Sequence, residues 1–329
     1  MSSIETRENS AKGIAYAFAV TFVGSSAGAA SKWVSTDIGV PQIVFIQYAI
    51  SLLIMLPWLV AQQQKSRSFA FLKTSRWPTH LVRGLAGWLC FYSYYHALKS
   101  IPLVDGTLLR NTAPLFVPVI AWLWLRARMP AYRWLPIILG FVGVALVLHP
   151  DVSQIGANNT LSYWIALFSG ITLAGSMVGT QILSRTESEA LILFYYFVIS
   201  LICSLPLAIM HWESIPLQHI PLLIYIGLSF FITMWLYTKA YSYAKASIVA
   251  PINYFAVVIA GFLGWMIWDH LPTEGSLLGV AVVMGAGVLT VYLAAKEQLR
   301  PKSVSPIPRE SQVPLETQAP PETVIGAEK

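Results

Sequence analysis

Apolar residues fill most of this chain in runs of about twenty, separated by short polar stretches. A helix of about 20 mostly apolar residues spans the roughly 30 Å of bilayer hydrocarbon, because each residue adds 1.5 Å. Hydrocarbon offers the backbone no hydrogen-bond partner, so each run must be helical. The pattern predicts an all-α membrane protein with ten transmembrane helices. The predicted spans are 13–34, 40–61, 80–98, 101–125, 132–149, 161–183, 190–210, 218–241, 246–268 and 275–295.

Basic residues lie mainly on one side of these spans. If the N-terminus is cytoplasmic, most of the 21 Lys and Arg residues fall in cytoplasmic segments or beside them, for example Lys65, Arg126 and Arg133. This asymmetry is the positive-inside rule, and it predicts that both termini are cytoplasmic. The net charge of +6 is then a topology signal, and we expect no nucleic-acid partner.

The composition excludes a soluble enzyme, since only 11% of the residues are charged and soluble domains have about 25%. The two cysteines, Cys90 and Cys203, lie in apolar segments and are interpreted as packing residues. No His or Cys pair has zinc-ligand spacing, so neither a metal nor a cofactor is expected. Residues 1–12 and 296–329 are predicted to be cytoplasmic tails, and the second is predicted to be disordered.

The two halves of the chain, 13–150 and 161–295, each hold five predicted spans and resemble one another. Residues 97–130 align with residues 240–272 with one gap, and each stretch covers the fourth span of its half. Because five is odd, the two copies cross the membrane in opposite senses. Inverted repeats are typical of transporters, in which they expose a central site alternately to the two sides.

One stretch carries a resemblance to a known family. It reads LVRGLAGWLCFYSYYHALKSIPLVDGTLL over 81–109 and continues as NTAPLFVPVIAWLWL from Asn111. It resembles the EamA family of the drug/metabolite transporter superfamily, in particular the branch of S-adenosylmethionine and riboflavin uptake carriers. The residues that match that branch include Arg83-Gly84, Tyr95, Asp105 and Pro114-Leu115-Phe116.

The resemblance covers about 13–295 and implies ten helices in two inverted repeats. It also implies secondary transport of a small metabolite by a multi-pass protein of the bacterial inner membrane, as a monomer or homodimer. The chain departs from the pattern at two places. Gln47 stands where the second span often carries an arginine, and Arg110-Asn111 stands where apolar or hydroxyl residues are usual. The family carries cargoes from amino acids to vitamins and metallophores, so membership does not name the cargo.

Arg110 is the strongest candidate for cargo binding. An arginine at the centre of a span costs about 2.5–3.5 kcal/mol, so it should face the interior of the bundle or a wet cavity. There its guanidinium can bind a carboxylate or phosphate through two parallel hydrogen bonds. The alternatives are a structural ion pair and a role in coupling. Asp105 is the obvious partner, although five helical residues place the two side chains about 140° apart.

Polar and aromatic residues near Arg110 complete the predicted substrate site. Asn111 follows it, and the repeat places Asn253 and Tyr254 at the matching depth of the ninth span. The alternative for these residues is helix–helix hydrogen bonding. In the third span, Trp88, Tyr92 and Tyr95 have helical spacing and are predicted to form one cavity-facing stripe. The alternative for the stripe is an interfacial belt with ordinary packing.

Asp105 and His96 are candidates for proton coupling, because both flank the turn between the third and fourth spans. The alternative role for Asp105 is structural: its carboxylate stabilises the N-terminus of the helix in whose first turn it lies. Arg83, at the inner end of the third span, is expected to extend to the interface in a structural role.

A membrane-embedded enzyme is the alternative of another class, but no HExxH, GxSxG or paired acids within a span are present. A P-loop is also absent, so no ATP motor or ATPase subunit is implied. The sequence therefore favours a secondary transporter of a small polar metabolite, carboxylate-bearing or zwitterionic. S-adenosylmethionine-like compounds, amino acids and vitamins fit that description. Uptake is favoured, and export of a metabolite, amino acid or metallophore is the alternative.

Overall fold

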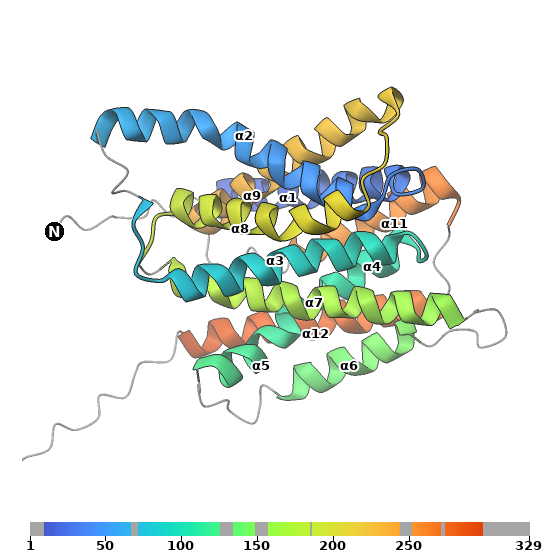
Figure 1. Cartoon of the computed structure of the whole chain (residues 1–329). Coiled ribbons are helices and arrows are strands. Elements are labelled where there is room, and N and C mark those ends of the chain that lie inside the picture. Colours follow the sequence, from blue (N-terminus) through green and yellow to red (C-terminus); the bar gives the residue numbers. More distant parts are fainter. Residues whose placement is uncertain are drawn as a thin grey trace, which may run out of the picture.

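The computed structural model describes residues 10–66, 72–125, 134–148, 157–184, 186–243, 252–270 and 274–298 (Figure 1). All the regular elements in these ranges are helices, so the predicted all-α class is confirmed there. The helices are α1 (Ser10–Val34), α2 (Val40–Ser66), α3 (Trp77–Leu98), α4 (Leu103–Arg110), α5 (Ala113–Leu125), α6 (Trp134–Leu148), α7 (Ala157–Leu183), α8 (Glu189–Met210), the 3-10 helix η3 (Leu217–His219), α9 (Ile220–Tyr243), α11 (Phe255–Trp268) and α12 (Glu274–Gln298).

Five of the described helices are long and apolar enough to cross a membrane. Their apolar stretches are Ala11–Val34, Val40–Gln64, Thr160–Leu183, Glu189–Met210 and Leu217–Ala240. Helix α3 has 22 residues, but it carries His80, Arg83 and His96. Most of the two predicted tails, and the first residues of the predicted ninth span, lie outside the described residues.

The predicted fourth span, 101–125, is not one helix. Helix α4 ends at Arg110, Asn111 and Thr112 form a turn, and α5 begins at Ala113. Pro114 explains the break, because a proline has no N–H to donate to the carbonyl four residues earlier, and its ring clashes with that carbonyl. The last carbonyls of α4 are satisfied locally. Asn111 Nδ2 donates to Thr107 O at 2.9 Å, and Thr112 Oγ1 donates to Leu109 O at 2.6 Å.

A second turn lies at the position that the internal alignment matches to this one. Asn253 and Tyr254 form a turn directly before α11. The amides of Ala256 and Val257 bond back to the carbonyls of Asn253 and Tyr254. Each half of the chain therefore has a turn at the same depth of its fourth predicted span.

Helix packing repeats when the two halves are exchanged. In the order of the predicted spans, α1 and α7 correspond, as do α3 and α9. The α1–α9 contact therefore corresponds to the α7–α3 contact, and both are observed. Likewise, α1 packs on α11 as α7 packs on α4 and α5, while α2 packs on α8 and α6 on α12. The pattern is that of a two-fold relation between halves.

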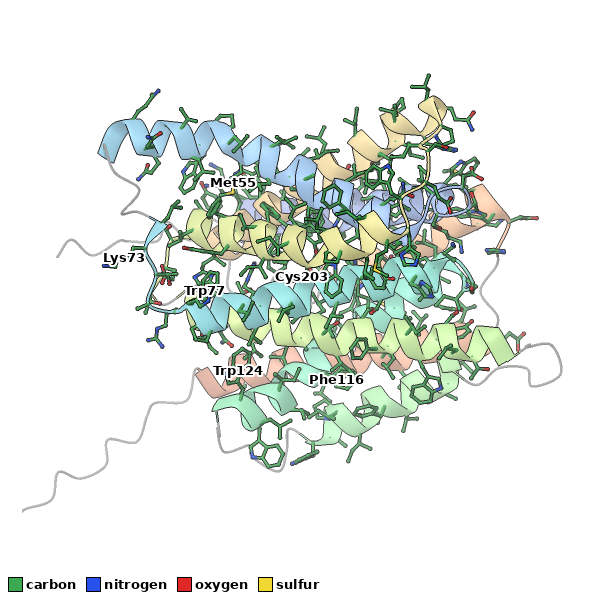
Figure 2. The ribbon with its side chains drawn as sticks, viewed as in Figure 1. Met55, Lys73, Trp77, Phe116, Trp124 and Cys203 are labelled. Atoms are coloured by element: carbon green, nitrogen blue, oxygen red, sulfur yellow. The ribbon has the colours of Figure 1, made fainter. Side chains whose placement is uncertain are left out.

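Charged and aromatic residues lie at both ends of the bundle. Helix α1 begins and α12 ends at the left of Figure 1. Lys73 and Trp77 lie at that end, and Trp124 lies near it on α5 (Figure 2). Tryptophans at a helix end are typical of the membrane interface. At the opposite end, Lys32 is buried (9% exposed), and its Nζ donates to Leu98 O at 2.6 Å and to Ile101 O at 2.7 Å.

The absence of a side chain at Gly170 allows α7 to lie directly on the α4–α5 break. A Cβ atom there would come within 2.5 Å of Leu109 O and 2.7 Å of Thr112 Oγ1. Gly175 is different, because its nearest neighbour would be Ala86 Cβ at 3.6 Å, an ordinary contact. Within two turns of α7, Gly170 therefore leaves no room for a Cβ atom, whereas Gly175 does.

We predict that Gly170→Ala destabilises the protein by about 1–3 kcal/mol, the usual cost of overpacking. The matched control, Gly175→Ala, should be close to neutral. The measurement is the thermal midpoint of the detergent-purified variants, followed by fluorescence-detected size exclusion. Equal midpoints for the two variants would contradict the close contact between α7 and the break.

Candidate functional site

Aromatic side chains from four helices form the centre of the bundle around α3. Helix α3 packs against α2, α4, α7 and α8. Tyr48 of α2 contacts Tyr196 of α8 and Phe230 of α9 edge to face, with ring centroids 5.7 Å and 5.4 Å apart. Phe91 of α3 contacts Phe230 at 4.8 Å. The Tyr48 and Tyr196 hydroxyls share a hydrogen bond of 3.2 Å. The centre of the bundle is therefore a packed cluster of rings, two of which carry hydroxyl groups.

Arg110, the last residue of α4, lies against this aromatic centre. Its Cζ is 4.3 Å from the centroid of the Tyr94 ring and 5.6 Å from that of Phe91. The Tyr94 ring is fixed in turn, because its hydroxyl shares a 2.8 Å hydrogen bond with Thr107 Oγ1. Arg110 is half-buried, and its Nε is buried without a hydrogen-bond partner. Among the described residues, no carboxylate forms a salt bridge with it.

Asp105 does not form the structural pair that was considered for Arg110. It lies in the first turn of α4, is 5% exposed, and accepts a 2.9 Å hydrogen bond from Tyr163 Oη of α7. The angular separation on α4 explains this, since Asp105 faces α7 while Arg110 faces α3. Its position in the first turn agrees with the capping alternative, although the N-cap position itself is Pro102.

Gln47 and Tyr95 connect α2 to α3 next to Tyr94. Tyr95 Oη donates to Gln47 Oε1 at 2.5 Å, and both residues are almost fully buried. The bond consumes the amide oxygen of Gln47, while its Nε2 is buried and has no partner. Sequence reasoning identified Gln47 only as a departure from the family pattern. Its polarity within an apolar span was the signal for a site residue.

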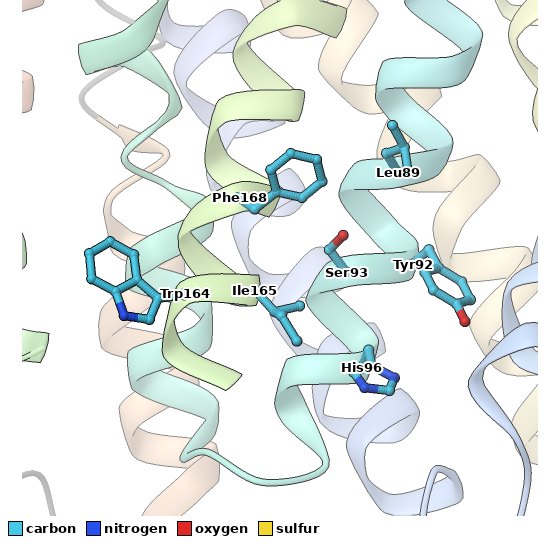
Figure 3. Close-up of a pocket in the computed structure, with 7 residues that line it drawn as sticks. All are labelled: Leu89, Tyr92, Ser93, His96, Trp164, Ile165 and Phe168. Atoms are coloured by element: carbon cyan, nitrogen blue, oxygen red, sulfur yellow. The ribbon is translucent and has the colours of Figure 1, made fainter. Parts of the chain in front are cut away.

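The predicted stripe of Trp88, Tyr92 and Tyr95 divides between two environments. Tyr95 is directed toward α2, whereas Tyr92 stacks on His96 at 6.3 Å and lines a groove between α3 and α7 (Figure 3). The groove has a volume of about 450 Å³ and is lined by Leu89, Tyr92, Ser93, His96, Trp164, Ile165 and Phe168. Trp88 contacts Tyr92, with the ring centroids 5.7 Å apart, and its Nε1 is buried without a partner. The three residues therefore do not line one common cavity, because α7 and α2 contact different sides of α3.

The remaining candidate residues come from the two turns and from the proposed coupling pair. Asn111 caps α4 and remains half-buried. Tyr254 packs in a cluster with Leu108 and Leu109, and its hydroxyl is buried without a partner. His96 and Asp105, the proposed coupling residues, also have different surroundings, since His96 is exposed and Asp105 is buried.

Arg83 is interior, contrary to the expectation that it extends to the interface. It is 6% exposed, and its Nε donates to Thr180 Oγ1 of α7 at 2.6 Å. Its Cζ lies 4.4 Å from the centroid of the Tyr196 ring of α8. The neighbouring Gly84 and Gly87 were the sequence signal, because they let α8 approach α3 closely around the arginine.

Comparison with known proteins bears on this arrangement. The sequence model of the EamA-like transporter family matches residues 11–149 and 160–292. An S-adenosylmethionine uptake transporter of Rickettsia bellii is 27% identical over 280 residues, which cover 85% of this chain and 93% of the relative.

Two further relatives have different named cargoes. A riboflavin transporter of Vibrio cholerae is 25% identical, with 84% of this chain and 91% of the relative covered. A pseudopaline exporter of Pseudomonas aeruginosa is 27% identical, with 83% and 94% covered. A protein of known crystal structure has a TM-score of 0.57 at 16% identity, with 88% of this chain and 99% of that chain covered, and so shares the fold.

We predict that Arg110 and Tyr94 are energetically coupled. A desolvated cation–π contact is worth up to about 2 kcal/mol. Tyr94→Leu should therefore destabilise the protein clearly less in an Arg110→Gln background than in the wild type. Tyr94→Phe keeps the ring and serves as the control for the hydroxyl. The measurement is a double-mutant cycle on thermal midpoints, and strictly additive effects would contradict the stacking.

Proposed function

The chain belongs to the EamA-like transporter family and is a multi-pass protein of the bacterial inner membrane, and on that premise we propose that it is a secondary active transporter. Its cargo is a small polar metabolite that carries a carboxylate or is zwitterionic. S-adenosylmethionine-like compounds, amino acids and vitamins are the cargo classes that we favour. Transport proceeds by alternating access through ten membrane-spanning helices, with both termini in the cytoplasm.

The observation that carries this proposal is the break between α4 and α5, with a turn before α11 at the matching position of the second half. Non-helical backbone inside a membrane protein is tolerated where it is buried in protein or lines a cavity. In transporters built from inverted repeats, such discontinuous helices form the substrate site near the midplane. Arg110 lies beside the break, and Asn253 and Tyr254 form the turn.

Arg110 is the proposed clamp for the cargo carboxylate, and residues of the two turns and of α3 complete the proposed site. Asn111, Asn253 and Tyr254 come from the two turns, and Trp88, Tyr92 and Tyr95 come from α3. The capping bond of Asn111 and the packed position of Tyr254 belong to this closed arrangement of the helices. Contact with cargo requires that the two halves separate, as in a rocking motion of one repeat against the other.

Uptake is the direction that we propose, since relatives named as uptake transporters match most of the chain. Export is the second candidate, because a relative of similar identity is named as an exporter. In either direction the protein acts as a carrier and not as an enzyme, and a gradient or exchange supplies the energy. Its partners are then the cargo and the bilayer, without an ATPase subunit, and it acts as a monomer or homodimer.

Loss of the guanidinium should abolish transport. We predict that Arg110→Ala removes transport while the protein still inserts, and that Arg110→Lys restores it only in part, because a point charge replaces a two-pronged donor. The measurement is mass spectrometry of cell contents and medium, with and without the protein. Enrichment inside cells indicates uptake, and enrichment in the medium indicates export. Normal transport by the Ala variant would contradict the clamp.

Asp105 is the proposed coupling group, together with His96. We predict that Asp105→Asn loses accumulation driven by a pH gradient but retains exchange of labelled cargo, because exchange needs no net proton movement. His96→Gln is tested in parallel, since this residue is exposed while Asp105 is buried. Unchanged pH dependence in both variants would leave Asp105 with a structural role only.

A further inference from the structure

Buried charge in the described bundle is predominantly positive. Lys32 and Arg83 are buried and Arg110 is half-buried, whereas Asp105 is the one acid among the buried described residues. The donors of Lys32 are used on two carbonyl oxygens, and those of Arg83 on Thr180 and the carbonyl of Ile192. Arg110 differs, because its Nε has no partner. Of the three cations, Arg110 is the one that the described residues show with a buried donor atom lacking any hydrogen-bond partner.

The contact between Arg110 and Tyr94 leaves the hydrogen-bond donors of the arginine available. Arg110 Cζ lies 4.3 Å from the centroid of the Tyr94 ring, which is within cation–π distance. A guanidinium carries its N–H donors in a fork geometry that matches the two oxygens of a carboxylate or phosphate. The ring accepts no conventional hydrogen bond from Arg110 Nε, which stays buried without a partner.

Gln47 adds a second unused donor on the neighbouring helix. Its oxygen accepts from Tyr95, so the amide is oriented with Nε2 as the free group. Tyr95 lies beside Tyr94, with ring centroids 5.6 Å apart, and Tyr94 carries Arg110. Gln47, Tyr95, Tyr94 and Arg110 therefore form a chain of contacts. Its two buried side-chain atoms without a partner are Gln47 Nε2 and Arg110 Nε, and both are N–H donors. Buried donors without partners are costly, and an acceptor supplied by a ligand removes that cost.

We propose that the bound cargo is an oxyanion of net negative charge, whose carboxylate or phosphate oxygens accept from Arg110 and from Gln47 Nε2. The inference rests on the proposed transport function, and among the cargo classes proposed above it selects acidic metabolites over S-adenosylmethionine-like compounds and net-neutral zwitterions. It also separates this protein from the named cargoes of two relatives, since S-adenosylmethionine carries net positive charge at neutral pH and riboflavin is uncharged. A net cation would add to the buried positive charge, whereas an anion offsets it.

The test uses simple anions as probes on the detergent-purified full chain. Thermal midpoints are measured with inorganic phosphate, with succinate, and with succinamide as the uncharged analogue of succinate, all at constant ionic strength set by chloride. Phosphate and succinate should raise the midpoint in a saturable way, and succinamide should not. A response to succinate alone, or to phosphate alone, identifies which oxyanion the site prefers.

Three variants locate the site. Arg110→Gln should weaken the apparent affinity by at least about tenfold, because a charge-assisted hydrogen bond is worth more than that step. Gln47→Glu, which keeps the shape but replaces the free donor with an acceptor, should do the same. Arg76→Gln is the matched control, since Arg76 is exposed at the start of α3. If Arg110→Gln does not yield folded protein, Arg110→Lys replaces it, with a smaller loss.

The outcomes separate this inference from the transport proposal. No stabilisation by either oxyanion, or equal stabilisation of Arg110→Gln and Arg76→Gln, overturns the inference even if a neutral or cationic metabolite is transported. Oxyanion binding that depends on Arg110 supports it. If that binding is present but the protein changes no metabolite's distribution in cells, the transport proposal fails and the anion site stands.

Discussion

Every polar group inside this bundle must find its partner within the protein, because hydrocarbon supplies none. The α4–α5 break shows how demanding this constraint is. The carbonyls at the end of α4 are satisfied by Asn111 and Thr112, and Gly170 of α7 covers the same turn at a distance no other residue would permit. Such a break forms only where side chains and a close glycine satisfy and cover its backbone. It places the charged end of α4 against the aromatic face of α3.

The same constraint gives α3 its central place. This helix is less apolar than α2, α7 and α8, and it lies among these three helices and α4. Arg83 finds Thr180 and the Tyr196 ring, Tyr95 finds Gln47, and Tyr94 finds Thr107 and Arg110. What remains unsatisfied along this line is therefore informative. The remaining groups are N–H donors on Arg110, Gln47 and Trp88 and the two ring nitrogens of His80, and the donors are the groups that an acidic cargo could satisfy.

The helix packing repeats when the two halves are exchanged, and this symmetry relates the site to the proposed motion of one half against the other. Each half contributes one turn in its fourth predicted span, and the contact of α4 with α11 lies where the halves meet. The halves are not chemically equal, however. The first half supplies Arg110, while the second supplies Asn253 and Tyr254 at the corresponding turn. A symmetric frame with an asymmetric site can present one cargo group to either side of the membrane.

The sequence alone determined the helical class, the membrane environment, the resemblance to the family and the candidacy of Arg110, because hydropathy and buried charge are local properties of the chain. The break in the fourth span was not predicted, since 101–125 was expected to be one helix, although Pro114 is its local cause. Tertiary structure decided which faces meet. Helical spacing put Trp88, Tyr92 and Tyr95 on one side of α3, but packing directs Tyr92 toward α7 and Tyr95 toward α2. Arg83 is interior and Gln47 offers a free donor for the same reason: a side chain's partners lie on other helices, and periodicity along one helix cannot show them.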